Sequence, residues 1–515
     1  MSGSETSVPW LTILAVLPLL GAVLTLLLPR GTALPKQVAL GVSLLTLGVS
    51  IVMGLQYDVG ERGFQFVEEH TWISSFGAHY AVGLDGLGLA LVLLTTILTP
   101  VVILASWHDA DDGRSGVNAF FAWMLALEGL AVGVFAATDV FLFYVLFEAT
   151  LIPVYFLIGG FGGPRRSYAA VKFLLYSLFG GLLMLASVVG LYVVSSGSAS
   201  GPSYLLEDLM NASMSQSTGR WLFLGFFIAF AVKAPMWPVH TWLPEAASEA
   251  TPGTSVLLVS VLDKIGTFGM MRFCIGIFPE ASRWAAPVVM ALAVVSVLYG
   301  ALLAIGQNDI RRLIAYTSVS HFGFMVLGIF AFTSQAQVGA SLYMFNHGLS
   351  TAALFLVAGF LVSRRGSKMI SDYGGVEKVA PVLAGTFLVA GLSSLSLPGL
   401  SPFVSEFLVL AGTFTTSIAA AVLATFGIVL AALYILLMYQ RTMTGPVRES
   451  TRNLPDLRPR EVAALAPLLA LIVVLGFFPK PALDVVTPTV DSLLAHVGIA
   501  DPTPTVAGGQ EGSSN

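Results

Sequence analysis

Long apolar runs separated by short polar segments make up most of the chain. A transmembrane helix needs roughly 20 consecutive, mostly apolar residues. The first such run is expected to be a retained helix and not a cleaved signal, because Glu5 and no Lys or Arg precede it and the run is too long. By this measure we expect fourteen spans: 8–29, 34–56, 84–107, 117–137, 139–160, 168–194, 220–241, 254–275, 284–306, 311–333, 336–362, 380–416, 418–440 and 461–482.

Two of the expected spans contain helix-breaking residues. Pro235 and Pro238 interrupt the seventh span, and Pro398, Gly399 and Pro402 interrupt the twelfth. The freed backbone groups must line a cavity or be covered by protein. Spans four to eight can be laid over spans nine to thirteen, which pairs the two broken spans; the offset of five spans reverses the topology. We therefore predict an all-α polytopic membrane protein of about fourteen helices with two inverted five-helix repeats, in which helices 7 and 12 are broken.

This pattern divides the chain into four parts. The long loop 57–83 alternates aromatic residues with glycines, which predicts a hairpin on the outer surface. The polar end of the chain, 497–515, is expected to be disordered. The expected parts are 1–116 with helices 1–3 and the hairpin loop, 117–275 with the first repeat, 276–440 with the second repeat, and 441–515 with helix 14 and the tail.

The distribution of basic residues predicts the orientation. Three of the 24 Lys and Arg residues lie within spans, Lys172, Lys233 and Lys264, and the other 21 lie in or beside loops, some of them at span ends. With the N-terminus outside, the inner loops hold Arg30, Lys36, Arg114, Arg165, Arg166, Arg311, Arg312, Arg364, Arg365, Lys368, Lys378, Arg441, Arg448, Arg452, Arg458 and Arg460. The outer side holds only Arg62, Arg220, Arg272, Arg283 and Lys480. Since cytoplasmic loops carry the excess of positive charge, both termini are expected on the outer face of a bacterial cell membrane.

Composition excludes several classes of protein. Hydrophobic residues make up 56% of the 515 positions and charged residues only 10%, against about 25% charged in a soluble domain. A soluble enzyme, a nucleic-acid binder and a disordered protein are therefore excluded. A single cysteine, Cys274, excludes a disulfide framework and a Cys-ligated iron–sulfur cluster. No glycine-rich phosphate-binding motif occurs, so nucleotide binding has no support.

Ionisable side chains inside the expected spans are candidates for function, because each is costly to place in a membrane. Asp263 directly precedes one of them, and His240 lies two turns beyond another. Lys172 is only about one turn inside, so we expect its amine to reach the surface. Seven such residues fall close to the middle of their spans: Glu128, Glu148, Lys233, Lys264, His321, His347 and Glu406.

Structural readings compete with a proton pathway at each position. Glu148 could simply tie helices together, Lys233 could form a static ion pair, and Lys264 could be neutralised by its neighbour, although adjacent helical residues point about 100° apart. A buried histidine is often only a satisfied core residue. A row of such groups at one depth nevertheless favours proton passage parallel to the membrane plane, with half-channels to each side. The spacing of the histidines does not indicate a metal site.

Several long segments resemble a known family. They are LFEATLIPVYFLIG, AVKAPMWPVHTWLPEAASEATPG, LLVSVLDKIGTFGMMRF, NDIRRLIAYTSVSHFGFMVLG and LPGLSPFVSEF. Together they are similar to the antiporter-like membrane subunits of respiratory complex I, strongly over roughly 80–445. A glutamate in the broken twelfth helix, Glu406, resembles subunit M, whereas the L and N subunits and the Mrp antiporter subunits usually have lysine. One departure is Ala247, where family members often have histidine.

The resemblance implies a proton-translocating subunit of NADH:quinone oxidoreductase with no redox centre of its own. FMN, iron–sulfur clusters and quinone are then expected in partner subunits, and L and N subunits as neighbours in the bilayer. It also implies roles for single residues: Glu148 and Lys233 as an ion pair, Lys264 as the central relay, His321 and His347 as its continuation, and Glu406 as its end. The alternative is a Mrp-type cation/proton antiporter subunit. A structural scaffold would leave seven costly groups unexplained, at about 2.5–3.5 kcal/mol each.

Overall fold

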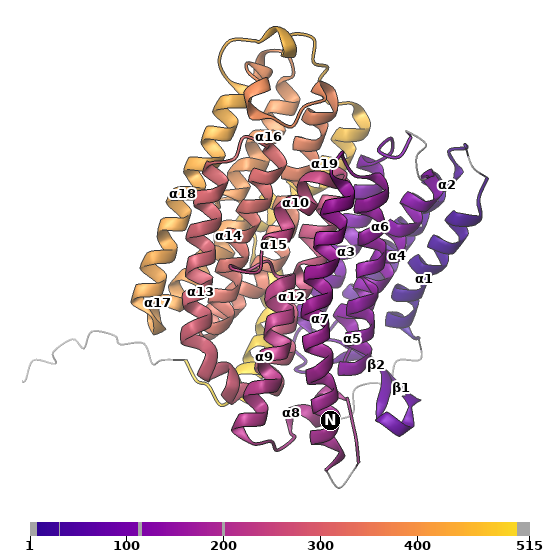
Figure 1. Ribbon diagram of the computed structural model, residues 1–515, viewed down its shortest axis with the longest axis vertical. Coiled ribbons are helices and arrows are strands. Elements are labelled where there is room, and N and C mark those ends of the chain that lie inside the picture. Colours follow the sequence, from indigo (N-terminus) through magenta and orange to yellow (C-terminus); the bar gives the residue numbers. More distant parts are fainter. Residues whose placement is uncertain (1–7, 30, 112–115, 198–200, 502–515) are drawn as a thin grey trace, which may run out of the picture.

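The computed structural model describes residues 8–29, 31–111, 116–197 and 201–501 of the chain. Within this part the protein is a bundle of helices with one small antiparallel hairpin (Figure 1). Twelve of the described helices are long and apolar enough to cross a membrane. The chain is therefore a multi-pass, all-α membrane protein, as its hydrophobic pattern predicts.

The N-terminal helices form one side of the bundle, the indigo and violet part of Figure 1. α1 packs along α4, and α2 packs against α3. Between α5 and α6 the helix is interrupted at Thr150, just before Pro153. The helices of this side are α1 (Trp10–Leu27), α2 (Leu34–Leu55), α3 (Gly86–Ala105), α4 (Val117–Ala136), α5 (Val140–Ala149), α6 (Leu151–Phe161) and α7 (Arg166–Ser196).

The remaining helices complete the bundle around a long central helix, α15. It contacts α3, α14, α16, α17, α19 and α20, and most of its residues are buried. The helices that follow α7 are α8 (Leu206–Met210), α9 (Gln216–Lys233), α10 (Trp242–Glu249), α11 (Pro252–Val256), α12 (Lys264–Gly269), α13 (Pro279–Ile305), α14 (Ile310–Phe330), α15 (Ser334–Arg365), α16 (Pro381–Ser394), α17 (Ser401–Thr416), α18 (Ile418–Met443), α19 (Pro459–Phe477) and α20 (Lys480–His496).

Both predicted helix breaks are present. α9 ends at Lys233, and the chain runs without regular helix to α10, which begins at Trp242. α16 ends at Ser394 and α17 begins at Ser401. These four pieces lie outside the twelve long apolar helices, because each piece alone is too short or too polar. Spans seven and twelve thus account for the difference between the twelve helices found and the fourteen spans expected.

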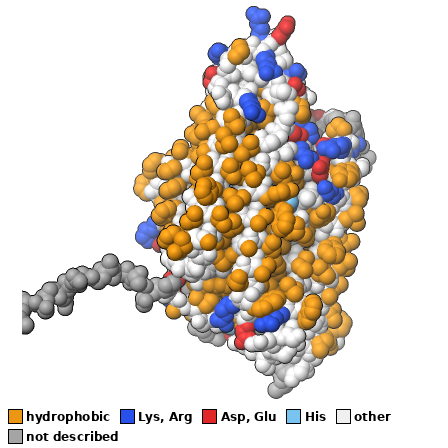
Figure 2. Space-filling view, turned by 60° about the vertical axis from the view of Figure 1, so that its left-hand side comes forward, with side chains coloured by type: hydrophobic (Ala, Val, Ile, Leu, Met, Phe, Trp, Pro, Cys, Tyr) orange, Lys and Arg blue, Asp and Glu red, His pale blue; other side chains and the backbone are white. Residues whose placement is uncertain are grey.

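The two ends of the bundle differ, and we name them by their contents. The hairpin face carries strands β1 (Gln65–Ile73) and β2 (Ala78–Leu84), which pair antiparallel. The arginine face is the opposite end, with the loops 162–165, 306–309, 366–380 and 444–458. Figure 2 shows hydrophobic side chains over the surface between the two ends, and charged side chains gathered at the ends. This arrangement fits a protein whose sides face lipid.

Two features of the fold were not expected from the sequence. The eighth span contains two π-helical segments, η2 (Leu257–Leu262) and η3 (Met270–Ile275), on either side of α12. A further helix, α20, follows the last span and packs against α3 and α15, where Thr489 accepts a hydrogen bond of 2.9 Å from the backbone N–H of Gly86. Of the tail predicted to be disordered, 502–515 lies outside the described residues.

Candidate functional site

Lys264 and His347 form the centre of the candidate site. Lys264 Nζ lies 2.8 Å from His347 Nδ1 and donates a hydrogen bond of 3.0 Å to the carbonyl of Val259. The ammonium also lies 4.4 Å from the centre of the Phe322 ring. Both side chains are buried. Val259 lies five residues before Lys264, in the π-helical segment η2, and its carbonyl is within reach of the Lys264 side chain at the start of α12.

His321 extends this contact towards the second broken helix. Its ring centre lies 5.1 Å from that of His347 and 5.9 Å from that of Tyr343. It also interacts with the backbone of Ser394, the last residue of α16. α14 and α15 thus bring two histidines together at the point where α16 ends. The two rings lie edge to face, and no hydrogen bond joins them among the described residues.

Glu406 lies on the other side of the break between α16 and α17. We call the buried and half-buried groups Glu148, Lys233, Lys264, His347, His321 and Glu406 the row. Glu406 is buried, and its carboxyl interacts with the hydroxyls of Ser396 and Tyr343. Ser396 has a left-handed backbone with φ of 58°, a conformation that non-glycine residues rarely adopt. Asn346 of α15 fixes the start of α17 by donating hydrogen bonds of 2.9 Å to the Ser401 carbonyl and the Ser405 hydroxyl. The break thereby presents polar groups to the carboxyl of Glu406.

Lys233 lies at the end of α9, at the first broken helix. Its ammonium is buried among aromatic rings, 4.9 Å from the centre of Phe147 and 5.8 Å from that of Phe173. The indole N–H of Trp242 donates a hydrogen bond of 2.9 Å to the carbonyl of Val232. This bond replaces a helical partner that the break removes. The break therefore holds the lysine in a buried, mostly apolar setting.

Glu148 is placed differently from the other members of the row. It is half-buried at the end of α5 and lies against Gly181 of α7, where a Cβ would come within 1.8 Å of its Oε1. Lys233 and Glu148 interact electrostatically. Neither Lys233 Nζ nor Glu148 Oε1 has a hydrogen-bond partner among the residues that the structure describes. The expected ion pair is thus not a direct contact in this conformation.

His240 and Glu128 lie apart from the row. The His240 ring packs edge-on against Tyr299, with ring centres 5.4 Å apart, and interacts electrostatically with Lys172. Glu128 is buried in α4 beside Thr99 of α3, and both of its carboxyl oxygens lack hydrogen-bond partners among the described residues. The sequence expectation grouped these residues with the relay, whereas the structure brings neither of them into contact with its other members.

A network of ion pairs surrounds α10 at the arginine face. Glu249 lies 3.0 Å from Lys368, and Glu245 lies 2.7 Å from Arg312. Arg165 reaches both carboxylates, at 3.3 Å from Glu245 and 3.7 Å from Glu249. Two loops and the first turn of α14 thus anchor this half-helix. In the sequence these basic residues indicate only the orientation, and the two glutamates in LPEAASEA are the one sign of the ion pairs.

A buried ion pair near the hairpin face was also missed. Arg272 of η3 lies 2.7 Å from Asp85, whose side chain also accepts a hydrogen bond of 2.8 Å from the backbone N–H of Gly88. The guanidinium packs between the rings of Phe64 and Phe268, with ring centres 4.8 and 4.7 Å away. This pair joins the eighth span to the start of α3, and nothing in the spacing of the two residues along the chain indicates it.

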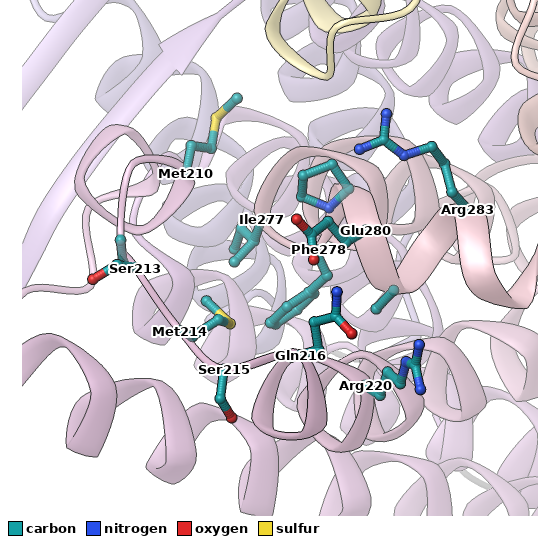
Figure 3. A pocket seen from close by; sticks show the side chains of 14 residues that line it. Met210, Ser213, Met214, Ser215, Gln216, Arg220, Ile277, Phe278, Glu280 and Arg283 are labelled. Atoms are coloured by element: carbon teal, nitrogen blue, oxygen red, sulfur yellow. The ribbon is translucent and has the colours of Figure 1, made fainter.

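A pocket at the surface lies away from the row. It has a volume of about 540 Å³ and is lined by the loop after α8 and the starts of α9 and α13 (Figure 3). Gln216, Arg220, Glu280 and Arg283 supply its polar groups. None of the row residues lines it, so the pocket is no part of the candidate site. Within the described part of the chain, no cluster of three or more His, Cys, Asp or Glu is placed to hold a metal ion.

Comparisons with known proteins show the family to which the chain belongs. A profile of the family described as "NADH:quinone oxidoreductase/Mrp antiporter, TM" matches residues 137–431. The chain is 51% identical to NADH-quinone oxidoreductase subunit M of Mycobacterium tuberculosis strain H37Rv, over 97% of both chains. It is 39% identical to subunit M of Rhodobacter capsulatus, over 94% of this chain and 96% of that one.

Solved structures give the same result. A chain of respiratory complex I from Thermus thermophilus superposes with a TM-score of 0.86 at 31% identity, covering 95% of this chain and 99% of that one. The Mrp complex from Dietzia shares the fold with a TM-score of 0.82, at 20% identity and with coverage of 95% and 100%. The chain therefore belongs to the NADH:quinone oxidoreductase/Mrp antiporter family, on the branch of the NADH-quinone oxidoreductase subunit M proteins.

Proposed function

We propose that this chain translocates protons as a membrane-arm subunit of a NADH:quinone oxidoreductase. The observation that carries the proposal is the contact between Lys264, His347 and His321, with Glu406 beyond them across a broken helix. Buried titratable groups at successive contacts are what a proton relay needs. A redox centre in this chain would instead need side chains that bind a cofactor.

The relay divides at Lys264. Glu148 and Lys233 form the first part, where a proton is taken up, and their charges interact across a short gap. Lys264 passes charge to His347 and His321, and Glu406 is the last acceptor. Each broken helix supplies free backbone groups where the path meets a half-channel. Glu128 and His240 would act as lateral groups that feed the row.

The assembly around the chain follows from the same proposal. Quinone reduction and NADH oxidation take place in partner subunits that hold FMN and iron–sulfur clusters. The neighbours in the membrane are L- and N-type antiporter-like subunits. The arginine face lies on the cytoplasmic side, because most loop Lys and Arg residues lie there. The division into 1–116, 117–275, 276–440 and 441–515, with 117–275 and 276–440 as inverted repeats, also belongs to this proposal.

A Mrp-type cation/proton antiporter is the second candidate function, and the shared fold favours it. The two candidates differ in their energy source and in their partners. Glu406 supports the first candidate, since a lysine is usual in the antiporter subunits.

Purification of the native complex decides between them. We expect a tagged chain to co-purify with flavin- and iron–sulfur-containing subunits, and vesicles containing the complex to acidify on addition of NADH. A preparation without redox subunits that exchanges cations for protons along an ion gradient would contradict the proposal. Acidification should cease when an uncoupler is added, which controls for proton release that does not cross the membrane.

A further inference from the structure

Asp263 is a buried carboxyl group that the relay described above does not use. Its exposed fraction is 0%, and neither carboxyl oxygen has a hydrogen-bond partner among the described residues. It lies at the junction of η2 and α12, where the helix changes from π to α geometry. A buried, unpaired carboxyl group is costly, so its presence at the centre of the bundle needs an explanation.

The direction of Asp263 follows from helix geometry. Residues three apart lie on one face of a helix, so Asp263 shares a face with Gly266. Gly266 touches the broken end of α9: a Cβ there would lie 2.5 Å from the backbone N of Ala234 and 2.6 Å from the carbonyl O of Phe230. Asp263 is thus on the side of α12 that faces the end of α9, where Lys233 lies. Lys264, one residue on, contacts His347 in the other half of the row.

The charges agree with this placement. Asp263 interacts electrostatically with both Lys264 and Lys233. A simple Asp263–Lys264 pair does not account for the arrangement, because the Lys264 ammonium bonds to the Val259 carbonyl and to His347. From Glu148 to Lys264 the signs therefore alternate: an acid, a lysine, Asp263 and a second lysine.

We propose that Asp263 is a shared counter-ion for Lys233 and Lys264, and that it couples the two halves of the relay. The inference rests on the proposed function and adds to the relay a residue, Asp263, that lies between its two halves. One carboxylate can compensate one ammonium in a dry interior, whereas two ammonium groups would leave an excess buried charge. The two lysines therefore compete for Asp263. Arrival of a proton at one lysine favours its loss from the other.

This role makes Asp263 a positioning residue for charge. It need not carry the transferred proton itself: the proton leaves the Lys233 ammonium and a proton is gained at the Lys264 amine, so that the number of charges around the carboxylate is unchanged. Removing its charge leaves the lysines without their common partner. Proton movement in the first half then no longer drives the second half.

The test replaces Asp263 in the intact complex and measures protons pumped per NADH oxidised in reconstituted vesicles. Asp263→Asn keeps the shape and removes the charge, and we expect it to lower this ratio about tenfold while the complex assembles. Asp263→Glu retains the charge and should restore at least about a third of the ratio. Asp111→Asn is the matched control: Asp111 lies 2.6 Å from Lys36 at the arginine face, far from the row, and we expect normal pumping from this variant.

Each outcome decides the proposal. A wild-type ratio in Asp263→Asn overturns it, and if Lys264→Ala and Glu406→Gln lose pumping in the same assay, the proposed relay stands without it. Wild-type ratios in all three variants overturn the relay as well. If Asp263→Asn does not assemble, Asp263→Ser is read in the same way. Failure of both neutral variants to assemble, with assembly of Asp263→Glu, would show a structural charge and overturn the coupling role.

Discussion

The two halves of the buried row are built differently. From Lys264 to His321, neighbouring side chains lie close together: Lys264 Nζ lies 2.8 Å from His347 Nδ1, and the two histidine ring centres are 5.1 Å apart. In the first half, Lys233 and Glu148 interact electrostatically but make no direct bond to one another. We call the half with the direct contact between Lys264 and His347 the closed half, and the half in which Lys233 and Glu148 make no direct contact the open half.

The cause lies in the helices that carry the two sets. His347 and Tyr343 lie in the middle of α15, a continuous helix of 32 residues that is buried for most of its length. Glu148 and Lys233 instead lie at helix ends, beside the interruptions at Thr150 and after α9. Side chains on a continuous buried helix have fixed positions, whereas helix ends can shift with little loss of packing.

Removing the acid of the open half should have the largest effect. Glu148→Gln keeps the volume of the side chain and removes the charge that interacts with Lys233. We expect NADH-driven pumping to fall tenfold or more, at about 1.4 kcal/mol per tenfold step, while the complex still assembles. Normal proton-to-electron ratios in the variant would show that the first half does not need this charge.

Removing the acid at the end of the closed half should also abolish most pumping. Glu406→Gln retains the hydrogen bonding of the side chain but cannot titrate, so we expect a loss of about tenfold in reconstituted vesicles. Glu406→Lys restores a titratable group of opposite sign and should keep a measurable part. If Glu406→Gln pumps like the wild type in an intact complex, the path does not end at this residue.

The junction between the halves can be compared with a lysine outside the row. Lys264→Ala removes the group that contacts His347, and we expect turnover to fall at least about fivefold. Lys172→Ala should cost less than about twofold, because Lys172 is only half-buried and lies beside the ring of Tyr168. NADH oxidation and pumping are measured together. Equal losses in the two variants, or a larger loss in Lys172→Ala, would contradict the expectation that a lysine in the middle of the membrane matters more for turnover than one near its surface.

The smallest effect on pumping is expected at an ion pair that serves only the fold. Arg364 at the end of α15 and Glu461 of α19 are 2.5 Å apart, and the exposed fraction of each side chain is 6%. Glu461→Gln leaves a buried charge without its partner, which costs about 3 kcal/mol. We expect a lower unfolding temperature of the purified complex and an unchanged proton-to-electron ratio. The exposed pair Lys480–Asp484, with exposed fractions of 82% and 45%, provides the control, since Lys480→Ala should alter neither quantity.

Much of the fold was predictable because the membrane restricts the choice. Apolar runs of about 20 residues have to be helices, and the prolines around Lys233 and before Glu406 indicated both breaks. The hairpin of 57–83 was also indicated by its glycines and aromatic residues. α20 was not predicted, because its sequence is amphipathic and short. The π-helical segments around α12 were not predicted either, since no residue type marks them.

The candidate site was predicted only in part. Ionisable residues within apolar runs can be recognised in the sequence, and all seven are buried or half-buried in the structure, whereas their roles in proton transfer stay predictions. Tyr343 was overlooked because a tyrosine in a buried helix is ordinary. Asp263 was set aside as a neighbour of Lys264. The sequence assigned no role to the glutamates of α10, and only their ion pairs with Arg165, Arg312 and Lys368 show that this half-helix is anchored.

The sequence by itself determined what must be buried and where the helices must break, because a membrane tolerates neither free charges nor free backbone groups without cause. Only the tertiary structure decided which of the buried groups meet. Lys264 and His347 are 83 residues apart along the chain, and their contact depends on how α12 packs against α15. Asp263 and Lys264 are adjacent in sequence, yet the Lys264 ammonium contacts His347 whereas neither Asp263 oxygen has a hydrogen-bond partner among the described residues, because successive side chains on a helix point in different directions.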